Sequence, residues 1–339
     1  MEQKHYDWVD FAKGIGIILV VYGHVARGVY NAGMIENQGL FKLVDSIIYS
    51  FHMPLFFFLA GLFFISSIVR RGEGGLIINK VDTIIYPYII WSLIQGSVAY
   101  SLEGVTNFST TIQDIYSLLW LPHDQFWFLY ALFLIFIAYT FLYRFITNIF
   151  LLFVVSILMY LFQDVLQSPW GIMNSIFKFG VYFCGGVLFS RYINVSLNKI
   201  RPWFLSIVFT LFVLSQWYYH NYLDWNYLNH DGLLLLFIGF VGIATVVVVS
   251  KLLAMIDFSL IKRIGSYSLE IYLVHVLFGS GFRIIMQKLF GFESSAFHLL
   301  FGTIVGVFVS ILFVWSVKHF GGSFLFYIPK KYQSSTYDK

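Results

Sequence analysis

Long apolar segments follow one another along the whole chain, and they limit the available folds more than any other feature. A helix that crosses a lipid bilayer needs about 20 mostly apolar residues. Because backbone polar groups must pair within the protein in lipid, such segments predict an all-α, polytopic transmembrane helix bundle. About ten spans are expected, at residues 11–29, 46–68, 82–102, 126–143, 147–163, 172–190, 202–219, 232–250, 264–285 and 295–317.

The composition excludes a soluble domain of ordinary type. Only 11% of the residues are charged and 59% are hydrophobic, whereas soluble domains are about 25% charged. The single cysteine, Cys184, lies in an apolar segment, so neither an intramolecular disulfide nor a cysteine metal site can form. No HxxxH or carboxylate-rich spacing occurs, and we expect no metal.

Every second connection between the predicted spans is rich in basic residues, and this alternation predicts the topology. Lys and Arg favour the cytoplasmic side of a membrane, and with an even number of spans both termini are then cytoplasmic. This distribution explains the net charge of +4 better than a nucleic-acid partner does. Since no connection is long enough for a second domain, residues 1–320 are expected to form one integral-membrane domain, followed by a short cytoplasmic tail at 321–339. The predicted inner side holds Lys4, Lys13, Arg70, Arg71, Lys80, Arg144, Arg191, Lys199, Arg201, Lys251, Lys262, Arg263, Lys318, Lys330, Lys331 and Lys339.

The first apolar segment begins with DFAKGIGIILVVYGH, from Asp10 to His24. Lys13 and His24 are eleven positions apart, which places them on nearly the same face of a helix and about 16 Å apart along its axis. A cation would then lie at the membrane surface and an imidazole deep in the bilayer. Ionisable residues cost about 2.5–3.5 kcal/mol to insert there, so they indicate function.

Two further histidines, His52 and His275, are predicted within spans. His24 and His52 are expected at similar depth, because short connections favour antiparallel neighbours, and His275 is expected near the middle of the membrane. Buried histidines can also serve only as hydrogen-bonding groups between helices. For His24 the functional interpretation is favoured, as a general base or as an acyl-accepting nucleophile; the residues do not distinguish these two roles.

Four cations lie near the predicted inner ends of the first three spans: Lys13, Arg70, Arg71 and Lys80. Together they are suited to the phosphates of a cytosolic donor. The alternative is that each one extends to the membrane surface and only marks the cytoplasmic side. Asp10 is three residues before Lys13 and is placed to pair with it.

Glu270 is the only acidic residue well inside a predicted span. It precedes His275 by five residues, about 140° around a helix, so its partner must come from another helix. Glu270 is therefore either paired with a cation for assembly or orients a histidine of the site. Trp127 is predicted as an interfacial aromatic residue. Gly185 and Gly186 are predicted to allow close helix packing.

The chain resembles the integral-membrane acyltransferase family 3, and within it the sugar O-acetylase branch that includes fucose 4-O-acetylase-like proteins. Five stretches carry the resemblance. The first is the most specific, because its basic residue, Lys13, and its histidine, His24, are separated by ten residues. The stretches are DFAKGIGIILVVYGH at 10–24, FHMPLFFFLAGLFF at 51–64, KVDTIIYPY at 80–88, FWFLYALF at 126–133 and SYSLEIYLVH at 266–275.

The resemblance implies a multi-pass protein of a bacterial cytoplasmic (inner) membrane. It implies an acyl donor, usually acetyl-CoA, that arrives from the cytosol as a co-substrate, with no bound cofactor. The acceptor would be a sugar hydroxyl on a cell-surface glycan or its lipid-linked precursor. His24 matches the catalytic histidine of the family, and Lys13 matches a basic position that is Arg in many members. Arg71 and Lys80 fall where the family carries arginines thought to contact donor phosphates, although Lys80 lacks the bidentate geometry of arginine.

The sequence thus predicts a membrane-bound O-acyltransferase, with acetyl-CoA, a glycan acceptor and membrane lipids as its partners. His24, His52, Glu270 and His275 are the catalytic candidates. Asp10 and Trp127 are candidates for acceptor binding or support. The main alternative is a transporter or exporter of a lipid-linked or polymeric glycan, which would use no acetyl-CoA. A non-catalytic partner in glycan assembly is the third interpretation.

Overall fold

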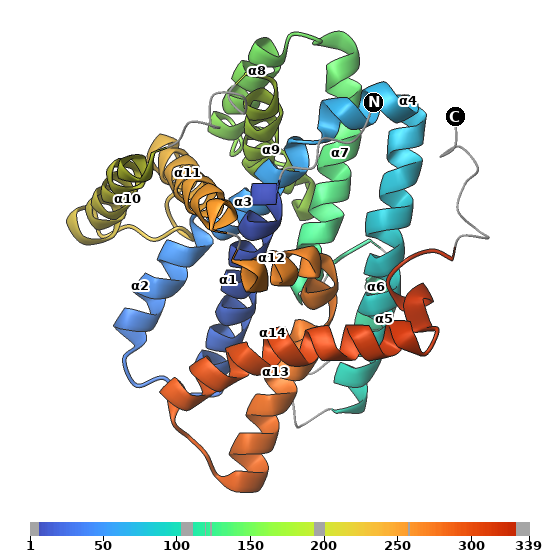
Figure 1. Ribbon diagram of the computed structural model, residues 1–339, viewed down its shortest axis with the longest axis vertical. Coiled ribbons are helices and arrows are strands. Elements are labelled where there is room, and N and C mark those ends of the chain that lie inside the picture. Colours follow the sequence, from blue (N-terminus) through green and yellow to red (C-terminus); the bar gives the residue numbers. More distant parts are fainter. Residues whose placement is uncertain are drawn as a thin grey trace.

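The computed structural model of the chain describes residues 7–102, 111–118, 120–122, 124–192, 201–256 and 258–329. Every regular element in these residues is a helix, and they contain no strand (Figure 1). The predicted all-α fold is therefore confirmed.

One helix, α1 (Asp7–Asn31), lies at the centre of the bundle (Figure 1). Its apolar residues occur on all sides, which is typical of a helix surrounded by others. Its neighbours come from both ends of the chain: α2 (Gln38–Tyr49), α3 (His52–Gly61), α11 (Leu233–Met255), α12 (Ser259–Ser266), α13 (Ser268–Phe290) and α14 (Ser295–His319).

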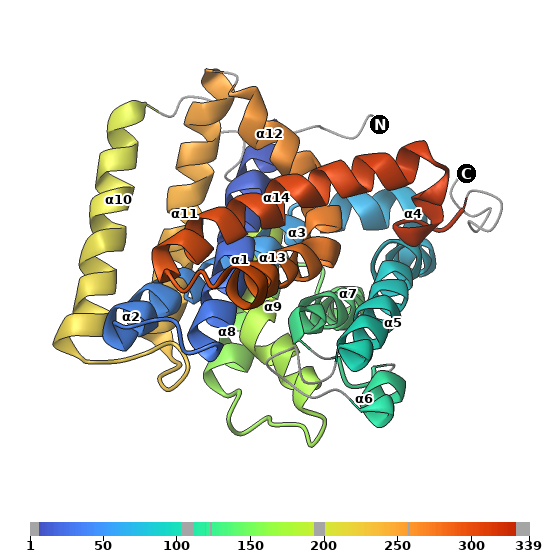
Figure 2. The same cartoon turned by 90° about the horizontal axis from the view of Figure 1, so that it is seen from below.

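The remaining helices surround this core. In the view from below, α10 stands at the edge of the bundle beside α11 (Figure 2). The helix α9 packs against α3 and α8. These outer elements are α4 (Phe64–Lys80), the π-helical turn η1 (Val81–Ile85), α5 (Tyr86–Ser101), α6 (Ile112–Ser117), α7 (Trp127–Phe145), α8 (Ile149–Leu161), α9 (Asn174–Tyr192) and α10 (Pro202–Trp217).

The described residues contain eight helical segments that are long and apolar enough to cross a membrane. This supports a multi-pass membrane protein, but it does not confirm ten spans. The predicted fifth span corresponds to α8, which has 13 residues, and the seventh to α10, which has 16 residues and continues into a π-helical turn. The eight are Asp7–Asn31, Gln38–Gly61, Phe64–Ser101, Asp124–Phe145, Gly171–Tyr192, Leu233–Met255, Ser268–Phe290 and Ser295–His319.

The connection expected between the second and third spans, residues 69–81, is helical. It forms most of α4, which is kinked at Gly72, where φ is 69°. The region stays ordered because Leu76, one turn after the kink, is fully buried. The π-helical turn then joins α4 to α5 without a loop.

Close packing at glycines fixes α3, the helix that begins with His52. A Cβ added to Gly186 would lie 2.0 Å from the Phe58 carbonyl oxygen, and one added to Gly61 would lie 1.9 Å from that of Phe183. Neither position accommodates a side chain without separating α3 from α9. The predicted packing role of Gly186 is thus confirmed, and it sets the position of α3, which begins with His52.

Candidate functional site

Two of the predicted histidines meet between α1 and α13. The ring centroids of His24 and His275 are 5.1 Å apart, with an angle of 64° between the rings. His275 is 1% exposed, and its Nδ1 lies 2.8 Å from the carbonyl oxygen of Tyr272. His24 is half-buried and lines a cavity of about 50 Å³ together with His275 and Arg283. Helices from opposite ends of the chain therefore build an imidazole pair.

The third predicted histidine, His52, contacts a tyrosine and not the other two histidines. The ring of His52 contacts Tyr49, with centroids 4.3 Å apart, and its Nδ1 lies 2.8 Å from the Ile48 carbonyl oxygen. Tyr49 in turn packs on Gly23, where an added Cβ would lie 3.0 Å from its ring. Among the described residues, His52 makes no ring contact with His24 or His275. It is close enough to interact electrostatically with His24.

An arginine one turn beyond His24 organises the predicted outer end of α1. The guanidinium of Arg27 donates to both carboxylate oxygens of Asp45 at 2.8 and 2.9 Å and lies 3.4 Å from the centre of the Tyr49 ring. It also donates to the hydroxyl of Tyr227. This network was not identified from the sequence. The positions of Arg27 and Asp45 at the facing ends of the first two spans were the available signal.

A cavity of about 320 Å³ runs along the opposite half of the same face of α1. Lys13, Ile17 and Val20 line it, and at about 100° per residue these positions form one stripe that continues to His24. Aromatic side chains, among them Phe128 and Tyr272, close its far side. Tyr272 also contacts the His275 ring, with centroids 6.0 Å apart. We call this the inner cavity; it leads from a cation toward the histidine pair.

Of the four predicted donor-binding cations, two meet at the inner cavity. Lys13 and Lys80 both line it. Lys13 is 3.4 Å from Asp10, as its spacing predicted, and the Lys80 ammonium lies 4.2 Å from the centre of the Phe136 ring. Arg70 is exposed on α4, and neither Arg70 nor Arg71 lines the cavity.

Glu270 lies apart from the histidines, in the first turn of α13. Its side chain is buried, with the residue 4% exposed, and its Oε1 is 2.7 Å from the Lys318 ammonium. The hydroxyl of Tyr327 also donates to Oε1. Burial, and then the neighbouring carboxylate, raises the pKa of Tyr327 well above its ordinary value, so this hydroxyl remains a donor. The structure therefore shows the ion pair between helices, and not a contact with a site histidine.

A family model described as an acyltransferase domain matches residues 6–315. The chain belongs to this acyltransferase family.

Relatives of this acyltransferase include two nodulation proteins named NolL. The protein from Sinorhizobium fredii is 32% identical over 121 residues, which are 33% of this chain and 32% of the relative. The protein from Mesorhizobium japonicum is 28% identical over 132 residues, which are 38% of this chain and 33% of the relative. The matched region thus spans about a third of the length of these curated relatives. No solved structure matches the acyltransferase.

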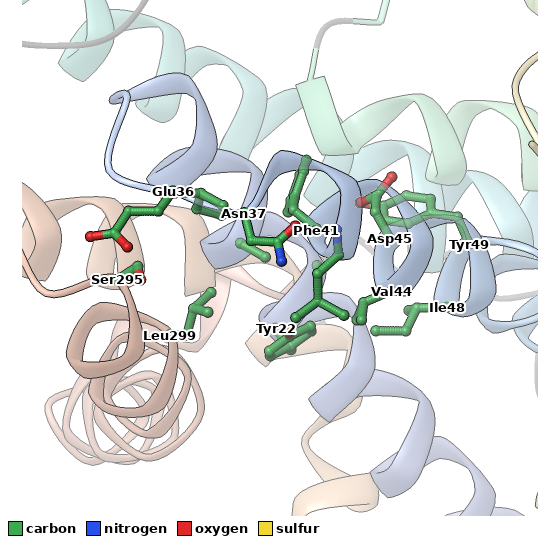
Figure 3. Close-up of a pocket in the computed structure, with 14 residues that line it drawn as sticks. Tyr22, Glu36, Asn37, Phe41, Val44, Asp45, Ile48, Tyr49, Ser295 and Leu299 are labelled. Carbon is green, nitrogen blue, oxygen red and sulfur yellow. Dashed lines mark hydrogen bonds between the residues drawn. The ribbon is translucent and has the colours of Figure 1, made fainter.

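A second large cavity of the acyltransferase, of about 270 Å³, lies between α1, α2 and the start of α14 (Figure 3). We call it the outer cavity. Its ionisable side chains are acidic residues and tyrosines, with Glu36 and Asp45 at its rim and Tyr22 and Tyr49 in its wall (Figure 3). Tyr22 is two residues from His24, so its side chain points about 160° away from the imidazole. The outer cavity therefore does not face the histidine pair.

Trp127 belongs to the packing of the acyltransferase. Its ring lies against Phe57 and Phe179, at centroid distances of 6.5 and 5.4 Å, and it lines none of the three cavities described above. Within the described ranges, no group of three or more His, Cys, Asp or Glu residues is placed to hold a metal ion.

Proposed function

We propose that this acyltransferase transfers an acyl group, in the simplest case acetyl, from an acyl-CoA to a hydroxyl of an extracytoplasmic glycan or lipid-linked sugar. The observation that carries the proposal is the inner cavity, which has two lysines at one end and continues along α1 toward His24. On the predicted topology the lysines face the cytosol. A bacterial cytoplasmic membrane supplies acyl-CoA on that side and glycan acceptors on the other.

The chemistry of the inner cavity suits the donor. Lys13 and Lys80 offer charge-assisted hydrogen bonds to the anionic phosphates of CoA, and the apolar walls beyond them suit the pantetheine arm. Val20, at the deep end, is four residues from His24, or about 6 Å along the helix. A thioester that extends along the stripe would therefore bring its carbonyl carbon toward the imidazole.

His24 is the proposed general base. It takes the proton of the acceptor hydroxyl while the oxygen attacks the thioester carbonyl. The new C–O ester bond forms, the C–S bond breaks, and the imidazolium returns the proton to the departing CoA thiolate. Attack by the His24 nitrogen itself, which gives an acyl-imidazole and then the ester, is the competing route. The small cavity that His24 lines together with Arg283 is the proposed approach for the hydroxyl.

The test is turnover of acetyl-CoA labelled in the acetyl group, by purified protein in detergent, with simple glycosides as acceptors. We expect wild-type protein to release CoA and label the glycoside, and His24→Ala to do neither. Tyr22→Phe, two residues away on the opposite face, is the matched control and should behave as wild type. Thioester cleavage that survives in His24→Ala contradicts the proposal. Wild-type protein that neither releases CoA nor labels the glycoside contradicts the acyltransferase proposal and favours an exporter. Label retained on wild-type protein favours the acyl-imidazole route.

A further inference from the structure

One nitrogen at the site lacks a partner although it is fully enclosed. His275 is 1% exposed, and its Nε2 is buried with no hydrogen-bond partner among the described residues. Buried polar atoms are nearly always paired, and each exception calls for an explanation. The His275 ring contacts the His24 ring, so His24 is the nearest candidate partner for this nitrogen.

The other nitrogen fixes the protonation state of this ring. His275 Nδ1 lies 2.8 Å from the Tyr272 carbonyl oxygen and 3.1 Å from that of Ile271. Carbonyl oxygens only accept hydrogen bonds, so Nδ1 carries the proton. In the neutral ring Nε2 then holds a lone pair, and His275 offers a single acceptor to its surroundings.

His24 is the group placed to donate to that acceptor. Its ring centroid is 5.1 Å from that of His275, a separation that permits an N–H···N hydrogen bond of about 2.9 Å once the rings meet edge to edge. Two other groups near His275 have partners of their own: the Tyr272 hydroxyl donates to the Gln125 carbonyl oxygen, and Arg283 donates through Nη1 to Gln287 at 3.4 Å. The Arg283 side chain also lines the small cavity, but the aromatic ring in contact with the His275 ring from α1 is that of His24. Among the described residues, His24 makes no other hydrogen bond that would compete with a bond to His275.

We propose that His275 is a positioning residue whose Nε2 accepts a hydrogen bond from one ring N–H of His24 and thereby holds the second His24 nitrogen unprotonated toward the substrate. This rests on the proposed function of His24. The roles are unequal because His24 is half-buried, whereas His275 is 1% exposed and its free nitrogen is enclosed. A second residue often sets the tautomer of a catalytic histidine.

The test combines kinetics with a direct reading of tautomers. The variants are His275→Ala, His275→Gln, which keeps a side-chain acceptor, and His24→Ala. His298→Ala is the matched control, because His298 is also fully buried, also bonds a backbone carbonyl oxygen and also has one unpartnered ring nitrogen. The measured quantities are kcat and KM for acetyl-CoA, and the 15N spectrum of histidine-labelled protein.

We expect His275→Ala to lower kcat by at least about tenfold with KM for acetyl-CoA little changed, and His275→Gln to recover part of the loss. In wild-type protein, the Nε2 signal of His275 should be that of an unprotonated nitrogen, and His24 should show one tautomer. In His275→Ala, His24 should show both tautomers. His298→Ala should match wild type in turnover and in the His24 signals.

Three results overturn the proposal. The first is an unchanged kcat in His275→Ala. The second is an equal loss in the Ala and Gln variants with a single His24 tautomer in both, which would mean a packing role. The third is a protonated His275 Nε2 in wild-type protein, a reading that needs no variant to fold. Turnover that persists in His24→Ala is a different failure, because it removes the proposed base and not only its partner.

Discussion

The inner and outer cavities border the same helix, yet they differ in charge and in direction. The inner cavity has Lys13 and Lys80 on an otherwise largely apolar wall, and it follows the stripe of α1 that ends at His24. The outer cavity has Glu36 and Asp45, and it borders the face of α1 that carries Tyr22. A CoA head group, which is a polyanion, is attracted by the two lysines and repelled by the Glu36 carboxylate.

This difference shows that cavity size alone does not identify the reaction site of the acyltransferase. Both cavities are close to the lower limit of ordinary ligand pockets, about 300 Å³. What distinguishes them is the residue at the end of each one. The inner cavity leads toward two imidazoles in contact, whereas Asp45, at the rim of the outer cavity, is already neutralised by Arg27.

The largest effect is expected from the residue that the inner cavity leads to. His24→Ala should lower CoA release by at least about 100-fold, because the general base is lost, while Tyr22→Phe on the opposite face should stay close to wild type. The measurement is the rate of CoA release from acetyl-CoA by proteins with the same elution profile. A comparable loss in Tyr22→Phe would break the distinction between the two faces of α1.

The second effect concerns the charges of the inner cavity. Lys13→Ala combined with Lys80→Ala should raise KM for acetyl-CoA about tenfold, the equivalent of one lost charge-assisted contact, with a smaller change in kcat. Lys262→Ala is the control, since this lysine pairs with Asp7 near the same end of α1 but does not line the cavity. The idea fails if the double variant and the control give the same KM.

The third effect is on stability at the start of α13, where Ser268 and Leu269 line the inner cavity. Glu270→Gln should lower the melting temperature, since breaking a buried pair leaves the Lys318 charge uncompensated, and should raise KM about two- to threefold without abolishing turnover. Glu73→Gln is the control, because the Glu73–Arg144 pair has exposed side chains and such pairs contribute little. Complete loss of turnover in folded Glu270→Gln would instead give Glu270 a catalytic role.

The smallest effect is expected at the outer cavity. Glu36→Gln removes a carboxylate from its rim and should leave KM for acetyl-CoA within about twofold of the wild-type value. The measurement is the same donor titration, carried out at low ionic strength, where long-range charge effects are greatest. A decrease in KM of more than about fivefold would mean that this carboxylate opposes the donor and that the donor enters near the outer cavity.

How much the sequence foretold differs between the donor end and the histidines. Helical spacing alone predicts that Asp10 pairs with Lys13, and the structure shows this pair. The same spacing places Lys13 on the face of α1 that carries His24, and the inner cavity runs along that face. That Glu270 needs a partner from another helix also followed from spacing. The identity of that partner, Lys318 in α14, did not, because 48 residues separate the two and only the packing of α13 on α14 brings them together.

The sequence by itself determined that the chain is an all-α membrane protein and which residues of α1 share one face. Apolar segments of about 20 residues must become helices in lipid, and residues at fixed helical intervals must share a side. Only the tertiary structure decided that His24 meets His275 while His52 stays behind Tyr49, and that Arg70 and Arg71 lie outside the inner cavity. The physical reason is that local spacing sets directions within one helix. Contacts between helices depend on close approaches such as those of Gly61 to the Phe183 carbonyl and of Gly186 to the Phe58 carbonyl.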